Sequence, residues 1–128
     1  MKYMLLVHHD EVTFAKRSES ERQQLIRESV QLANDLHSQG KYVSAAPLHP
    51  TAETTCVRMR DSKRFVTDGP FAETREQLGG FFLIDAEDLE EAVAIAARIP
   101  GARIGTVEVR AVTEVEGLPR MNSQDIPT

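Results

Sequence analysis

Residues 66–85, VTDGPFAETREQLGGFFLID, contain a turn, a charged run and a strand in direct succession. Asp68-Gly69-Pro70 is a turn signal, because glycine supplies backbone angles that other residues disfavour and proline fixes φ. The last six residues, GFFLID (80–85), are apolar at successive positions, as in a strand that is covered on both faces. The segment therefore predicts a loop that enters a buried strand. Because ordered loops often carry function, it also raises the question whether this loop takes part in a site.

The chain on either side of this loop alternates between strand and helix patterns. Strands are indicated by large apolar residues or a two-residue alternation, and helices by apolar residues at three- and four-residue spacing. In chain order the sequence predicts a strand at 2–8, a helix at 18–39, a strand at 42–48, a hairpin at 54–60 and 63–67, a strand at 80–85, a helix at 85–99 and a strand at 106–112.

The expected ends of the helices follow from capping residues. Ser18, with a glutamate three positions later, predicts the start of the first helix, and Gly40 its end. Asp85 is the expected N-cap of the second helix, which Pro100-Gly101 would end. In the hairpin, Val57 and Met59 are expected on one face, opposite a polar face.

Without the hairpin, the predicted order is βαββαβ, the order of ferredoxin-like α+β folds. Both helices would then lie on one face of the sheet. The strands at 2–8 and 80–85 are apolar throughout, so the other face also needs a cover, and this chain has no further predicted helix to supply it. We therefore expect a second copy to cover it, which gives a symmetric homodimer.

Composition is that of one globular domain. The 128 residues are 41% hydrophobic and 27% charged, and Cys56 is the single cysteine, which excludes an intrachain disulfide and fits a reducing compartment. The apolar run at 4–7 is too short for a secretory signal, and none is long enough for a membrane helix. With a formal charge of −5 and scattered basic residues, nucleic-acid binding is not expected. We predict a cytoplasmic protein with one domain at 1–113 and a flexible or partner-packed tail at 114–128.

Residues 66–86, preceded by MKYMLLVHHDE (1–11), resemble the YCII-related, or DGPF-domain, family of small bacterial proteins. The tetrapeptide 68–71 gives that domain its name, and most residues from 72 to 80 also follow the family pattern. The likeness extends over about residues 1–113. It implies a dimeric α/β barrel of ferredoxin-like subunits. Related YCII-type proteins are thought to use a His and Asp pair in a cleft, one subgroup removes chloride from a chlorinated hydroxyquinol, and some DGPF-domain proteins are encoded beside extracytoplasmic-function sigma factors.

His8, His9 and Asp10 end the first predicted strand and are candidate site residues. Neighbouring residues on a strand point to opposite faces, so at most one of the two histidines enters a given pocket. Imidazole titrates near neutral pH, which suits proton transfer. The alternative is that both histidines are simply polar residues where the strand leaves the sheet.

Three loop residues complete the candidate set. Asp68 either caps its own turn or serves as the carboxylate partner of a histidine on the neighbouring central strand. Phe71 either fills an apolar gap or stacks on a ligand, and Glu73 either lies on the surface or orients a polar group of a substrate. The sequence does not decide between these alternatives.

No metal or cofactor is expected. His37 and His49 stand at no metal-binding spacing, and the glycine patterns that bind phosphate are absent. Two function classes remain: a cofactor-independent enzyme with His/Asp acid–base chemistry on a small metabolite, and a non-catalytic ligand-binding or interaction module linked to transcriptional or stress regulation. A third alternative is that the loop only makes dimer contacts.

Overall fold

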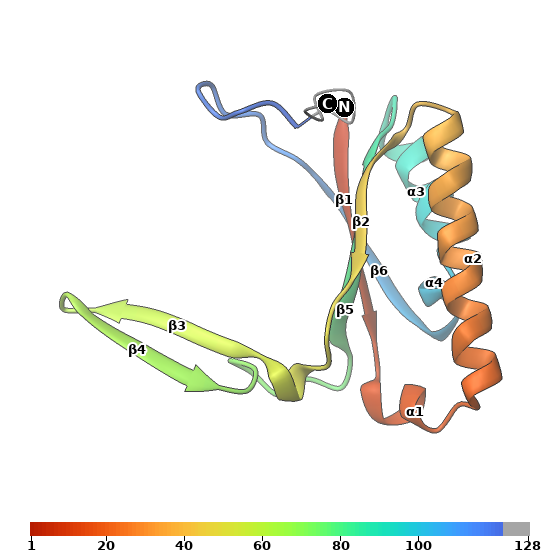
Figure 1. Ribbon diagram of the computed structural model, residues 1–128. Helices are drawn as coiled ribbons and strands as arrows, with labels where there is room; N and C mark the ends of the chain where they lie inside the picture. Colours follow the sequence, from red (N-terminus) through yellow and green to blue (C-terminus); the bar gives the residue numbers. More distant parts are fainter. Residues whose placement is uncertain (122–128) are drawn as a thin grey trace, which may run out of the picture.

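The computed structural model describes residues 1–121 and shows a four-stranded antiparallel sheet with helices on one face (Figure 1). The strands are β1 (Lys2–His9), β2 (Tyr42–Pro47), β5 (Gln77–Asp85) and β6 (Gly105–Ala111), in the order β2-β5-β1-β6. The first and third strands of the βαββαβ unit are thus central neighbours. This arrangement confirms the predicted ferredoxin-like α+β fold.

Two long helices, α2 (Glu19–Ser38) and α3 (Leu89–Arg98), lie on the covered face of the sheet. Three short helices join the elements: α1 (Glu11–Ala15), α4 (Gly101–Ile104) and the 3₁₀ turn η1 (Thr51–Glu53). As predicted, Ser18 caps α2 by accepting a hydrogen bond from the backbone of Glu21. Gly40 follows α2 with a φ of 72°, a conformation that glycine adopts without strain.

The predicted start of the second long helix is wrong. Asp88, not Asp85, caps α3, because its side chain accepts a hydrogen bond from the backbone of Glu91. Asp85 instead ends β5, where its carboxylate accepts a hydrogen bond from the Lys2 ammonium group at 3.2 Å. The sheet ladder therefore extends to Asp85 and delays the helix by one turn.

The inserted hairpin consists of β3 (Thr55–Arg60) and β4 (Lys63–Asp68), which form a separate two-stranded sheet. Asp61 and Ser62 both have positive φ, 49° and 63°, as in the tight turns that match strand twist. Figure 1 shows the hairpin running away from the four-stranded sheet, on the side opposite the helices.

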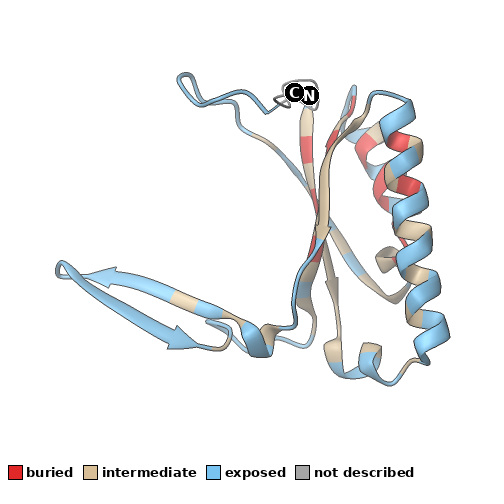
Figure 2. Cartoon of the chain, viewed as in Figure 1, coloured by how far each residue is buried: buried red, intermediate tan, exposed pale blue. Residues whose placement is uncertain are grey.

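The core lies between the sheet and the helices (Figure 2). Tyr3 and Leu5 of β1 point into it, together with Ile84 of β5 and with Leu32 and Leu36 of α2. Residues at the alternate positions of the central strands face the other side of the sheet, on which no described helix lies. They include Met4, Leu6 and Phe81, which are partly exposed, and Leu83, which is buried.

Beyond β6 the described chain has no further helix or strand. It follows the uncovered side of the sheet at the end remote from the hairpin (Figure 1). The predicted tail at 114–128 is described only as far as Met121, and the rest lies outside the described residues. No helix within residues 1–121 combines the length and apolar character needed to cross a membrane.

Candidate functional site

A cavity of about 570 Å³ lies between α2 and the sheet. Its wall is predominantly apolar, and residues of α1 and α4 border it at its sides. The apolar lining residues include Val7, Phe14, Leu25, Ile26, Val30, Ala33, Tyr42, Ala45, Pro47, Phe82, Ile99, Pro100 and Ile104.

The cavity exists because the apolar stripe of α2 is longer than the core that covers it. In the C-terminal half of the helix, Leu32 and Leu36 are buried. Nearer the N-terminus, Ile26 and Val30 keep 59% and 54% of their surface exposed and line the cavity instead. Apolar residues that remain open to solvent in a concave site are the usual lining of a small-molecule pocket.

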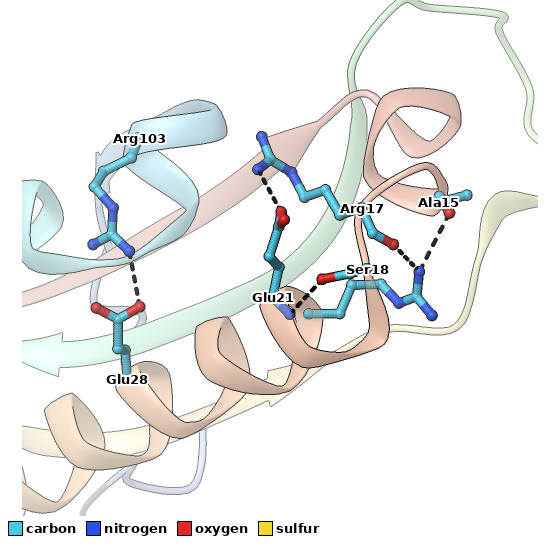
Figure 3. A network of polar contacts seen from close by, with 7 residues as sticks. Ala15, Arg17, Ser18, Glu21, Glu28 and Arg103 are labelled. Carbon is cyan, nitrogen blue, oxygen red and sulfur yellow. Dashed lines mark hydrogen bonds and ion pairs between the residues drawn. The ribbon is translucent and has the colours of Figure 1, made fainter.

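Two ion pairs flank the N-terminal half of α2 (Figure 3). Arg103 of α4 donates to Glu28 of α2 at 2.8 Å and so links the two helices, whereas Arg17 lies 3.7 Å from Glu21 at the start of α2 itself. These groups line a shallow hollow of about 410 Å³ between α2 and α4, where the opposite charges already pair with each other.

His9, at the end of β1, enters the cavity. Alternation along β1 places it on the same face as Tyr3 and Leu5, and its ring lies 4.8 Å from that of Phe14. Space for the imidazole comes from a β-bulge: Val7 faces Gly80 and His8 faces Leu78, which leaves Gly79 as the extra residue. A Cβ atom at position 79 would overlap the His9 ring.

Burial lowers the pKa of His9. The carboxylates of Glu11, Glu76 and Asp10 act in the opposite direction, but desolvation outweighs them. His9 is therefore uncharged at neutral pH. Its ring then presents one nitrogen that donates and one that accepts a hydrogen bond.

Other polar groups of the cavity lie on or near α2: Ser29, Asn34 and His37. The rings of His37 and Tyr42 meet edge to face, with centroids 6.1 Å apart. Among the described residues that line the cavity there is no Asp, Glu, Lys or Arg. Because an unpaired buried charge is costly, this lining favours an uncharged ligand.

His8 lies on the opposite face of the sheet from His9, as the alternation along the strand predicts. Its Nε2 atom pairs with the carboxylate of Glu108 on β6. The two histidines are therefore in different environments, and only His9 reaches the cavity.

Asp10 is occupied by its own helix. It caps α1 by accepting hydrogen bonds from the backbone of Val12 and Thr13 at 3.0 and 3.3 Å. The backbone bond from Thr13 is the largest cause of its lowered pKa, and Arg75, 4.0 Å away, acts in the same direction. Asp10 thus orients the chain that follows His9 and does not line the cavity.

Asp68, Phe71 and Glu73 lie away from the cavity. Asp68 ends β4 opposite Thr55, and all three side chains are exposed, Phe71 to 82%. No hydrogen bond or ion pair within residues 1–121 joins Asp68 to His8 or His9. The backbone of Gly69, with a φ of 89°, donates to Thr54 at 2.7 Å and closes the base of the hairpin.

Of the six candidate residues, the structure thus places His9 in the cavity and the other five outside it. Phe14, His37, Tyr42 and Ile104 were not predicted as site residues. The sequence feature that could have indicated the cavity is the apolar stripe of α2, which begins at Leu25, several residues before the part of the helix that is buried. No group of three metal-ligating side chains occurs in the described part of the chain.

The comparisons with known proteins show the family of the chain. The sequence profile of the YCII-related domain matches residues 1–116. A protein of Rhizobium meliloti (strain 1021), described as uncharacterized, is 36% identical over 112 residues, which cover 86% of this chain and 90% of the relative. The chain therefore belongs to the YCII-related family.

Proposed function

We propose that the protein binds a small, uncharged and largely apolar molecule in the cavity between α2 and the sheet. The observation that carries this proposal is a mainly apolar wall without Asp, Glu, Lys or Arg, into which the uncharged imidazole of His9 enters. The apolar part of the ligand would lie against α2. Its single polar group would exchange a hydrogen bond with His9.

Magnitudes narrow the class of ligand. Burying one aromatic ring removes about 150 Å² of apolar surface from water, which at about 25 cal/mol per Å² is worth about 4 kcal/mol. This gain sets an upper bound on the affinity, because association also costs translational and rotational freedom, and a hydrogen bond adds about 1 kcal/mol. Phenols, quinols and neutral aryl amides have this composition.

A thermal-shift screen with uncharged phenols, quinols and aryl amides tests the proposal. The matched variants are Ser29→Leu, whose side chain lines the cavity, and Ser38→Leu, which lies on the exposed end of the same helix. In both cases the serine hydroxyl donates to a backbone carbonyl of its own helix, so the two substitutions remove the same kind of bond.

A ligand at ten times its Kd stabilises the native state by about 1.4 kcal/mol, which raises Tm by several degrees in a domain of this size. We expect this shift for the wild type and Ser38→Leu and a much smaller one for Ser29→Leu. A panel without any active compound, or equal shifts in all three proteins, contradicts the proposal.

The second candidate function is acid–base catalysis in the same cavity. His9 supports it, because an uncharged imidazole inside a desolvated pocket is equipped to accept a proton from a bound substrate. Asp68 would act as the catalytic partner of His9 only if the loop moved so that its carboxylate reached the imidazole ring.

The catalytic candidate is tested by the exchange of an acidic C–H hydrogen of a bound compound with deuterium oxide. The wild type should catalyse this exchange and His9→Gln should not. Equal exchange on both proteins would contradict catalysis by His9.

We also propose that the protein is a homodimer paired through the uncovered face of the sheet. Met4, Leu6 and Phe81 form a partly exposed apolar set on that face beside the buried Leu83, and no described helix packs on it. Sedimentation velocity should give twice the 14.3 kDa mass of one chain, and a strictly monomeric mass would reject the pairing. The cytoplasmic location and the link to transcriptional or stress regulation stay predictions.

A further inference from the structure

We infer that the β3–β4 hairpin is an arm that reaches past the sheet interface and packs its apolar face against a second copy of the chain. This inference rests on the homodimer proposed above. The first observation is that the arm lacks support within its own chain. β3 and β4 pair with each other, no other described helix or strand packs extensively on them, and eleven of the twelve strand residues are exposed. A two-stranded hairpin is marginal at best when it stands alone in water.

The two faces of the arm differ. Val57 and Val66 are directly opposite each other, and Met59 lies next to them on the same face. All three side chains are more than half exposed. Arg64, opposite Met59, is the cationic residue of this face. The other face carries Arg58, Arg60 and Lys63 around the half-exposed Phe65. A mainly apolar face opposite a more cationic one indicates a segment that lies on another surface.

The position and length of the arm indicate which surface it contacts. The arm projects from the uncovered side of the sheet (Figure 1). Six residues at about 3.4 Å each give it a length of about 20 Å, whereas two packed sheets lie only about 10 Å apart. The arm of one copy therefore extends beyond the plane of the partner's sheet, and it would lie along the partner's flank.

The area needed for a stable dimer also favours a second copy of the chain as the partner of the arm. Four strands of about seven residues present a flat area of about 480 Å², whereas a standard interface buries roughly 800 Å² of accessible surface per partner. One face of the arm offers about 200 Å² more of flat area, and receiving the partner's arm covers a similar area. With both arms engaged, the flat area of contact of each copy nearly doubles.

Charge is consistent with this pairing. Residues 55–68 contain four cationic and two acidic side chains, although the whole chain has a formal charge of −5. The arm is thus a basic segment on an acidic protein. An acidic second copy attracts it, and electrostatic complementarity of this kind orients partners as they meet.

Sedimentation of the full chain over a dilution series tests the arm with two variants that add the same charge. Val57→Asp places a carboxylate on the apolar face, and Thr67→Asp places one on the opposite face of the neighbouring strand. We expect Val57→Asp to raise the dimer Kd by at least about tenfold, because an unpaired charge would be buried, and Thr67→Asp to change it little. Met59→Asp repeats the test on the apolar face should Val57→Asp fail to fold.

The other outcomes are distinct. A monomeric wild type overturns both the dimer and the arm. A dimeric wild type that both variants leave unchanged, or that both weaken equally, overturns the arm and leaves the sheet interface intact. Assemblies that grow beyond two copies as concentration rises would show that the arms link many copies in a row. That outcome also contradicts a dimer in which the two arms engage each other's copy.

Discussion

His9 owes its environment to three of its neighbours. The bulge at Gly79 opens the space that the imidazole occupies, and Phe14 of α1 lies against its ring. Asp10, the next residue, caps α1 and so fixes the direction in which the chain leaves β1. Because burial of the ring removes water from it, the pKa of His9 is lowered, although the Asp10 carboxylate acts in the opposite direction.

This lowered pKa predicts a pH dependence of stability. The unfolded chain has an ordinary histidine pKa of about 6.5 and binds a proton below that pH more readily than native His9 does. The free energy of unfolding therefore keeps its full His9 contribution above about pH 6.5 and loses it as the pH falls toward the native pKa. Between about pH 7.5 and pH 5.5, the urea midpoint of the wild type should fall further than that of His9→Gln. Equal losses in the two proteins would show that burial does not affect the charge of His9.

At the scale of the elements, α2 has two functions along its length. Its C-terminal half packs into the core through Leu32 and Leu36. Its N-terminal half spans the cavity, where Arg103 of α4 pairs with Glu28. The buried contacts of the C-terminal half keep α2 on the sheet, while part of its apolar stripe remains uncovered.

The two aspartates near the start of α3 provide a test of where that helix begins. Asp88→Ala removes the N-cap and should lower the free energy of unfolding by about 0.5–2 kcal/mol. Asp85→Ala removes only a partly exposed ion pair with Lys2, for which about 0–1 kcal/mol is expected. Chemical denaturation of both variants measures these losses. A larger loss in the free energy of unfolding for Asp85→Ala than for Asp88→Ala would place the N-cap of α3 at the end of β5.

Most elements could be predicted from the sequence because their periodicity extends over many residues. The strands, α2 and the hairpin turn at Asp61-Ser62 belong to this group. The helices α1 and α4 have five and four residues, too few for an amphipathic period to show. The start of α3 was missed because Asp85 and Asp88 are both plausible caps, and only the register between β5 and β1 distinguishes them.

For the whole molecule, the two faces of the sheet differ. One face and the helices border the cavity, and the other face, with the arm, is where we propose that a second copy packs. Alternation along β1 predicted that His8 and His9 would face opposite sides, but not which side holds a cavity. That depends on how closely α2 packs on the sheet. The distance from Asp68 to a histidine was also beyond prediction, because β4 leaves the body with the hairpin and does not continue directly into β5.

The central claim is that the ligand site is the cavity beside His9. The most direct test is a titration of the wild type with the strongest compound of the thermal-shift panel, followed through the imidazole NMR signals of its four histidines. We predict that the His9 ring signals change on binding, while those of His8, on the opposite face of the sheet, and of the exposed His49 stay in place. Changes at His8 without changes at His9 would contradict the claim and move the site to the other face of the sheet.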